Sequence, residues 1–290
     1  MVTRKIAALV AAATAVVVAA CAAWVYSGRT DPSPGRPPQA DAGRLSARLP
    51  FYPFLHAPSE RQWRIATAER RLAITCMAAH GHRYAPAEIP GPGAAAADHP
   101  LPFGLESLTR ATPGPVPTAS EQRESKAFLA ALYGPDDRRI SAEGKSIKVS
   151  WPAQGCQAEA EKRLLGTERL RWLRTTIAIG EGEQQARRNL ARDPAFRAAD
   201  ARWARCMRAA GVATDDPVDL LDSLPRTTDL ATSPVAGADV RCKAGTDYLR
   251  TAYARLAVAQ RAWLDAHPDT VATWQSLMRR QDEVAREVLG

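Results

Sequence analysis

The sequence lacks the short motifs that usually reveal an enzyme. Its 290 residues contain no G-x-S-x-G nucleophile turn, no H-E-x-x-H zinc motif, no phosphate-binding glycine loop and no dinucleotide-binding fingerprint. They also contain no dense basic block interleaved with aromatics, which argues against nucleic acid as a partner. No cofactor is predicted. These absences favour a binding or scaffold protein, with an enzyme as the alternative.

Lysine is scarce. The chain has 39 basic residues, mostly arginine, against 31 acidic ones, which gives a formal charge of +8. Together with abundant alanine and proline, this is typical of the coding bias of a GC-rich genome. Salt screens so modest a surplus, so the charge gives a weak preference for anionic lipids or acidic wall polymers.

Charge is absent from the run Ile6 to Tyr26, which follows Arg4 and Lys5. An apolar helix of this length spans roughly 30 Å, the thickness of the hydrocarbon core of a bilayer, and the basic flank favours a cytoplasmic start. We therefore expect residues 1–27 to hold the chain to the cell membrane, with the main domain on the extracytoplasmic side.

Three interpretations of this segment stay open. Trp24 and Tyr26 suit the outer interface of an uncleaved anchor. Residues 18–21 (V-A-A-C) resemble the lipobox of bacterial lipoproteins, so that cleavage would leave a lipidated Cys21. The third interpretation is secretion after cleavage of a signal peptide. All three place residues 30–290 outside the membrane.

Cysteine usage agrees with export. Apart from Cys21 the chain has four cysteines, an even number that in an oxidising compartment predicts two disulfide bonds. Three pairings are compatible with this set: Cys76, Cys156, Cys206 and Cys242.

Proline divides the exported part. Residues 28–58 are rich in proline, serine and glycine and are expected to form a tether. Residues 59–290 then form the extracytoplasmic domain. A second proline-rich segment at 86–117 is expected to be a surface loop or a disordered insertion.

The domain is predicted to be mainly α-helical. Ser59 and Gln62 form a capping-box pattern before a helix that Gly81 closes, and Thr118 with Glu121 suggests a second such start. Alternation between residues 140 and 151 predicts a β-hairpin. Apolar spacing then predicts further helices. We expect a disulfide-stapled helical bundle with a small hairpin; the later helices fall at 155–165, 167–192, 194–210, 217–224, 239–266 and 268–289.

A weak internal repeat favours one pairing of the cysteines. Residues 76–81 and 206–211 both have the pattern C-M-x-x-x-G at a predicted helix end, and each is followed later by a cysteine that opens a helix. This indicates two weakly related units, at about 59–166 and 167–290. It favours bonds from Cys76 to Cys156 and from Cys206 to Cys242.

The chain resembles a group of uncharacterised proteins. The features that carry the resemblance are the anchor, the tether, the two C-M-x-x-x-G helix ends and Trp203, three residues before Cys206. The proteins of this group are secreted or lipoprotein-like proteins of high-G+C Gram-positive bacteria. The resemblance implies an envelope location and a fold type. It transfers no catalytic residue.

The clearest candidate metal site is C-M-x-x-H-x-H, formed by Cys76, Met77, His80 and His82. Soft and imidazole ligands of this kind suit copper or zinc. The competing interpretation is that a disulfide occupies Cys76. Ala210 stands where the second repeat would need the equivalent of His80.

Three hypotheses on function follow. The first is a non-enzymatic envelope module that binds an envelope protein or an anionic wall polymer. The second is a wall hydrolase with an unrecognised site; Glu181 and Glu183, set between glycines, are paired carboxylates with no partner that the sequence places opposite them. The third is a metal-binding envelope protein that uses His80 and His82.

Overall fold

The structure is a computed structural model that describes residues 38–55, 59–89, 91–92, 101–108, 125–225 and 227–290. Residues Pro38–Gly290 form one compact unit. The predicted membrane segment, Cys21 and the capping pattern at Thr118 lie outside the described residues, so these stay predictions. Within the described part of the chain, no helix combines the length and apolar composition needed to cross a membrane.

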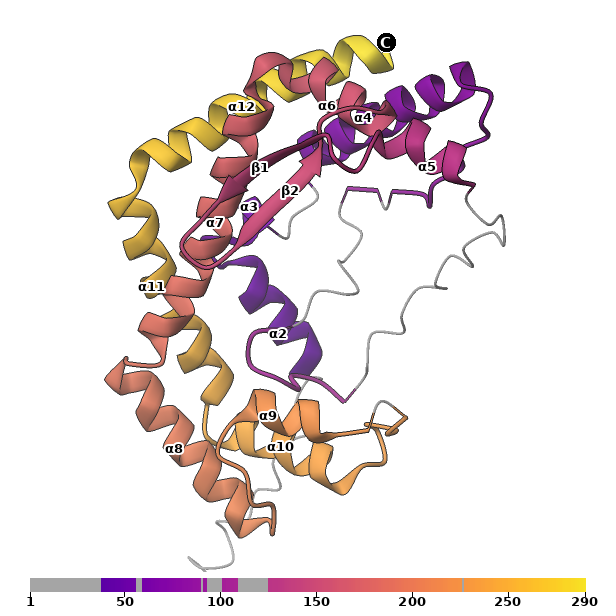
Figure 1. The fold of residues 1–290 in the computed structure, drawn as a ribbon. Coiled ribbons are helices and arrows are strands. Elements are labelled where there is room, and N and C mark those ends of the chain that lie inside the picture. The colour runs from indigo at the N-terminus through magenta and orange to yellow at the C-terminus, as the bar shows by residue number, and fades with distance from the viewer. Residues whose placement is uncertain (1–37, 56–58, 90, 93–100, 109–124, 226) are drawn as a thin grey trace, which may run out of the picture. The chain divides into compact units, whose positions relative to one another are not determined.

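Helices dominate this unit, as the sequence predicts (Figure 1). The N-terminal part contains α2 (Pro38–Ala47), α3 (Tyr52–Leu55), α4 (Glu60–Ala79), α5 (Lys126–Tyr133), β1 (Arg139–Glu143) and β2 (Lys148–Pro152). The remainder contains α6 (Cys156–Leu165), the 3-10 turn η1 (Gly166–Glu168), α7 (Arg169–Leu190), α8 (Pro194–Ala209), α9 (Pro217–Ser223), α10 (Pro234–Gly245), α11 (Tyr248–Ala266) and α12 (Pro268–Leu289).

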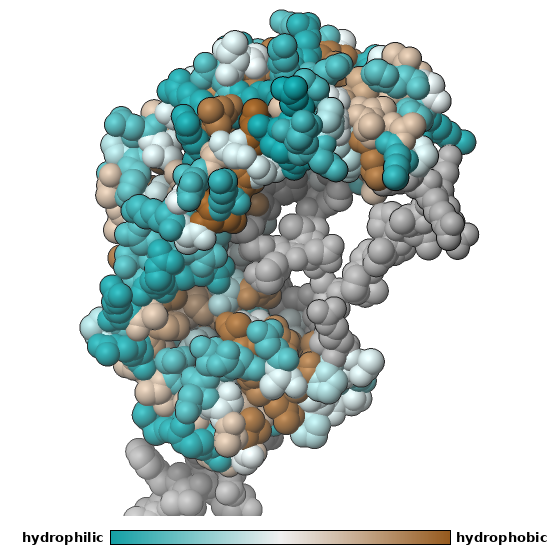
Figure 2. Space-filling model, in the orientation of Figure 1, coloured by the Kyte–Doolittle hydropathy of each residue, from teal (hydrophilic) through white to brown (hydrophobic). Residues whose placement is uncertain are grey.

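The helices pack in two main groups. In one, α4 packs against α6 and α12 around buried Ile65, Leu164 and Met278. In the other, α11 packs against α7 and α8, where Trp203 and Leu256 are fully buried. Most of the face drawn in Figure 2 is hydrophilic, with hydrophobic residues gathered over α9 and α10 and beside the hairpin.

The predicted hairpin is confirmed. Strands β1 and β2 pair antiparallel, with Ile140 opposite Trp151. The hairpin lies on α7, where Ala142 packs against Leu173 and Ile177. Glu181 of α7 accepts a hydrogen bond from the Ser146 backbone N–H at 2.7 Å, so this carboxylate holds the turn of the hairpin.

The prediction of a tether over residues 28–58 is wrong for residues 38–55. This stretch forms α2 and α3, and Phe51 between them is 1% exposed. The Phe51 backbone N–H donates to Oε1 of Gln260, which is also buried. Because prolines are tolerated in the first turn of a helix, their number here does not exclude helices.

The second proline-rich segment is a loop without helix or strand, exposed or half-buried, at residues 86–89 and 91–92, as predicted, but the prediction of a surface loop is wrong for residues 101–108. Residues 101–108 run through the protein interior, where Lys243 Nζ donates to the carbonyls of Phe103 (2.8 Å) and Leu105 (2.5 Å) and pairs with Asp239 (2.8 Å). Glu106 accepts from Tyr253 Oη at 2.8 Å. A buried charge is tolerated when it is paired and hydrogen-bonded, as Lys243 is here.

The predicted helix at 239–266 is two helices. Helix α10 begins at Pro234, capped by the Ser233 side chain, and ends at Gly245. Asp247 then takes a left-handed conformation (φ 55°) before α11 starts. The chain therefore turns where a single long helix was expected.

Candidate functional site

The two C-M-x-x-x-G helix ends have the same backbone structure. At the end of α4, the N–H of His80 donates to Cys76 O and Met77 O, and the N–H of His82 donates to Met77 O at 2.9 Å. At the end of α8, Ala210 and Val212 make the equivalent bonds, the latter also at 2.9 Å. Both are Schellman-type ends, in which a glycine with positive φ follows the helix.

Each helix end carries one disulfide pair. Cys76 and Cys156 lie at disulfide distance, with Cα atoms 5.5 Å apart, and so do Cys206 and Cys242, at 5.6 Å. This is the pairing that the repeat favoured. Because Cys76 is bonded, its sulfur cannot serve as the thiolate ligand of the metal site suggested by the sequence.

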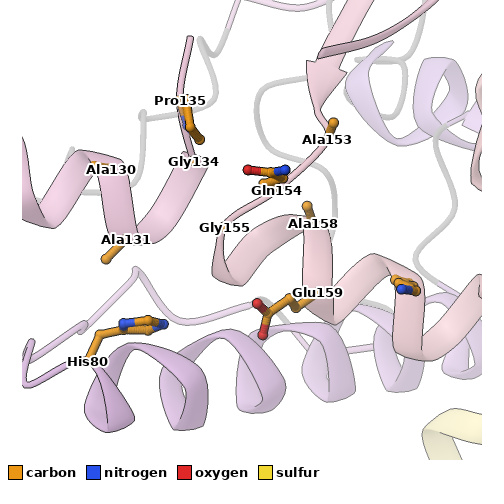
Figure 3. A pocket seen from close by; sticks show the side chains of 11 residues that line it. His80, Ala130, Ala131, Gly134, Pro135, Ala153, Gln154, Gly155, Ala158 and Glu159 are labelled. Atoms are coloured by element: carbon orange, nitrogen blue, oxygen red, sulfur yellow. The ribbon is translucent and has the colours of Figure 1, made fainter. Parts of the chain in front are cut away.

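The two candidate histidines lie in different surroundings. His82 packs edge-on against the ring of Phe128, with centroids 5.6 Å apart. His80 is exposed and lines a pocket of about 420 Å³, named here the His80 pocket. Figure 3 shows His80 of α4 and Glu159 of α6 reaching toward one another across this pocket.

The upper wall of the His80 pocket depends on glycine. Gly155 has φ +89°, and a Cβ atom there would lie 2.4 Å from the backbone nitrogen of Gly134. Only glycine allows this approach, which brings the end of α5 against the start of α6 (Figure 3).

A second concave site has a different composition. This cleft, named here the glutamate cleft, has a volume of about 330 Å³. Five elements contribute to it, α4, β2, α6, α7 and α12. Its lining residues are Glu69, Trp151, Pro152, Gln157, Glu161, Leu164, Leu165, Trp172 and Gln281.

Glu161 is held by an arginine. Arg169 donates from Nε at 2.9 Å and from Nη2 at 2.5 Å to Glu161 Oε2, and the same Nη2 donates to Pro152 O at 2.8 Å. Both side chains are nearly buried, at 12% and 11% exposed. Burial raises the pKa of Glu161, and the hydrogen bonds and charge of Arg169 oppose that rise. The pair fixes one carboxylate at the cleft wall.

Glu69 has no such partner. Its carboxylate receives no hydrogen bond and makes no ion pair with any residue that the structure describes. Burial, reinforced by the negative charge of Glu161, raises the pKa of Glu69 to about 7. A buried polar group without a partner is costly to a fold, and such groups cluster at functional sites.

The cleft therefore combines two carboxyl groups, both with pKa values raised by burial, with two indole rings and two amides. Trp151 and Trp172 are partly buried and supply apolar faces, while Gln157 and Gln281 both donate and accept hydrogen bonds. A protonated Glu69 leaves the Glu161–Arg169 pair balanced, so the cleft is close to neutral. Its chemistry suits an uncharged ligand with hydroxyl and amide groups.

No sequence motif marks this site. Glu69 and Glu161 are 92 positions apart and belong to no motif. One signal was present, because Glu69 lies midway between Ile65 and Ala73 at spacings of four, on the buried face of α4. A carboxylate within an apolar stripe marks a position where burial works against ionisation.

Comparisons with protein-family models, with curated proteins and with solved structures find no match to this chain.

Proposed function

We propose that the chain is a membrane-anchored, extracytoplasmic binding module whose glutamate cleft takes a neutral, hydroxyl-rich saccharide of the cell envelope. The observation that carries the proposal is Glu69, a partly buried carboxyl group that lines the cleft and has no hydrogen-bond partner among the residues that the structure describes. A ligand hydroxyl would supply the missing hydrogen bond. The apolar faces of Trp151 and Trp172 would cover the C–H face of a sugar ring.

The residues that line the cleft favour a neutral glycan over the anionic wall polymer that the sequence also suggested as a partner. An anionic wall polymer needs positive charge, and the arginine at this cleft is already neutralised by Glu161. A neutral glycan needs no such charge. The supporting features are therefore the two indoles, the two glutamines and the protonated carboxyl group.

The test uses the full chain in detergent with a chitin tetrasaccharide (β-1,4-linked N-acetylglucosamine) as the probe. Calorimetric titration and tryptophan fluorescence are expected to show binding by the unsubstituted chain and a loss of about tenfold or more in affinity for Glu69→Ala. Glu159→Gln is the matched control, since this carboxylate is on α6 outside the cleft. Equal affinities for the Glu69 and Glu159 variants would contradict the proposal.

A second candidate function is hydrolysis of the bound glycan. It is favoured by two carboxyl groups in one cleft with different hydrogen-bond partners: burial raises the pKa of Glu69 to about 7, and Glu161 accepts hydrogen bonds from Arg169. Two carboxyl groups with separate protonation states are what acid-assisted glycoside cleavage requires. Release of reducing ends from the tetrasaccharide, abolished by Glu69→Gln, would establish it; binding without turnover leaves the binding module.

The anchoring part of the proposal has its own test. Peptide mass spectrometry of protein extracted from native membranes distinguishes an intact N-terminus from a diacylated Cys21. Recovery of the chain in a soluble fraction, with neither feature, would contradict membrane anchoring.

A further inference from the structure

We infer that the Cys76–Cys156 pair, once reduced, forms a zinc site together with His80 and Glu159. This site is separate from the glutamate cleft and does not depend on the proposed saccharide. It also differs from the sequence motif, because it uses Cys156 and Glu159 of α6 in place of Met77 and His82.

The ligand atoms are already gathered. Among the described residues, one group of three metal-ligand residues stands out, namely Cys76, His80 and Cys156, whose ligand atoms all lie within 4.8 Å of one another. A fourth ligand is adjacent, since Cys76 Sγ lies 3.5 Å from Glu159 Oε2. Two thiolates, an imidazole and a carboxylate make a tetrahedral set of the kind that zinc accepts.

Helix geometry places these four side chains as two facing pairs. Cys76 and His80 are four residues apart at the end of α4, and Cys156 and Glu159 are three apart in the first turn of α6. Residues at these spacings lie on one face of a helix. The two helices pack against each other, so the pairs face a common point.

The site is open to solvent on one side. His80 and Glu159 are exposed and both line the His80 pocket, as Figure 3 shows, and Cys76 is partly exposed. Cys156 itself is fully buried, which supplies the shielded side of the site.

The chemistry balances with a dithiol as the reductant. A dithiol transfers two electrons and two protons to the Cys76–Cys156 bond and becomes a cyclic disulfide, leaving two cysteine thiols. Zinc then binds both sulfurs as thiolates, and the two thiol protons pass to solvent. Rotation of the freed side chains lets the sulfurs separate to the roughly 3.8 Å that zinc–sulfur bonds of about 2.3 Å require.

The other bridge provides an internal comparison. Cys206 is followed four residues later by Ala210, and Cys242 three residues later by Gly245. The second pair thus has neither an imidazole nor a carboxylate at the two positions that matter. Reduction should create a zinc site at the first bridge and not at the second.

The experiment titrates zinc chloride into the full chain in detergent, oxidised or reduced with a water-soluble phosphine, which becomes the phosphine oxide and forms no competing thiolate. The reduced chain is expected to bind one zinc ion per chain, and the oxidised chain none of comparable affinity. Cobalt in place of zinc should give a thiolate charge-transfer absorption. Absence of reduction-dependent zinc binding would overturn the inference.

Three variants assign the ligands. His80→Ala and Glu159→Gln are expected to lower zinc affinity by at least the roughly 10- to 100-fold that loss of an outer-shell partner costs. His82→Ala is the matched control and should keep full affinity. If His82→Ala loses the ion while His80→Ala keeps it, the proposed ligand set is wrong.

Circular dichroism covers the case in which reduction unfolds part of the chain. Zinc should then restore helix content in the reduced unsubstituted chain, because metal binding is coupled to folding of the ligand-bearing helices. It should fail to do so in His80→Ala. No restoration in either protein would overturn the inference.

Discussion

The two disulfide-stapled helix ends share a sequence pattern and a backbone structure but differ in their surroundings. Near Cys206–Cys242, Trp203 Nε1 donates to Asp239 at 2.8 Å, and Asp239 pairs with fully buried Lys243. Near Cys76–Cys156, His80 and Glu159 are exposed and line an open pocket. The end of α8 lies in a core whose buried polar groups are hydrogen-bonded. The end of α4 leaves polar groups available to a ligand.

The repeated motif determines the same local backbone structure at both helix ends. It does not determine the function of either end. The shared glycine and buried methionine fix the turn at both ends, with Met77 and Met207 each fully buried. The residues outside the pattern, such as His80 against Ala210, decide the chemistry. Substitutions on one side of this comparison at a time test it.

The largest effect is expected from Lys243→Met. It would leave Asp239 buried without its counter-charge, so we expect the free energy of unfolding to fall by about 3–5 kcal/mol. Urea unfolding followed by circular dichroism measures the loss. The control, Lys162→Met, removes an exposed lysine at the His80 pocket and should change stability by less than about 0.5 kcal/mol. Equal losses would contradict the contrast between the two ends.

Removal of each disulfide should destabilise by about 2–4 kcal/mol. Cys76 and Cys156 are 80 positions apart, and Cys206 and Cys242 are 36 apart. Loop-closure entropy therefore makes Cys76→Ala/Cys156→Ala the more costly double variant, by about 0.7 kcal/mol. A clearly greater loss in the free energy of unfolding on removal of Cys206–Cys242 would show that native packing around this bond outweighs loop-closure entropy.

The dependence of the free energy of unfolding on pH tests the raised pKa of Glu69. Its folded-state pKa of about 7 is above the ordinary value of 4.5, so the folded chain keeps a proton that the unfolded chain releases. The free energy of unfolding should therefore fall as the pH rises from about 4.5 to about 7. Glu69→Gln should remove the contribution of Glu69 to this loss and raise the free energy of unfolding by about 1–3 kcal/mol at pH 8.

Glu106→Gln is the comparison for that measurement, because burial raises the pKa of Glu106 to about 7 as well. Glu106 already accepts hydrogen bonds from Tyr253 and Phe103, so its amide variant should lose part of this network and gain less than Glu69→Gln. A greater gain for the Glu106 variant would contradict the description of Glu69 as the unpartnered group.

The smallest effect is expected at the helix caps. Ser59 forms a reciprocal capping box with Gln62 at α4, whereas Ser233 makes a single cap bond at α10. Each serine-to-alanine change should cost about 1 kcal/mol, with the larger loss for Ser59→Ala. Thermal unfolding measures the difference. A larger loss at Ser233 would show that the reciprocal bond adds no stability.

Local signals in the sequence predicted much of the helical framework. Capping residues and prolines placed the starts of α4, α8 and α12, because such residues act on the backbone within three or four positions. The break between α10 and α11 was missed, although Ser233-Pro234 and Gly245 marked both ends of α10.

Features that depend on distant partners could not be predicted. Residues 101–108 are buried because Lys243, 138 or more positions away, binds their carbonyls. Phe51 is buried because it packs against Ile179 and Trp263, and Gln260, 209 positions away, accepts a hydrogen bond from its backbone N–H. The Glu69–Glu161 pair likewise arises where α4 meets α6, and neither carboxylate carries a motif.

The central claim, that Glu69 is an unpartnered acid awaiting a ligand, is tested most directly by nuclear magnetic resonance titration of its carboxyl carbon, assigned with Glu69→Gln. The account predicts a pKa near 7 in the free protein and a clear change in both chemical shift and pKa on addition of the chitin tetrasaccharide. Titration near the ordinary value of 4.5, unaltered by the saccharide, would contradict it.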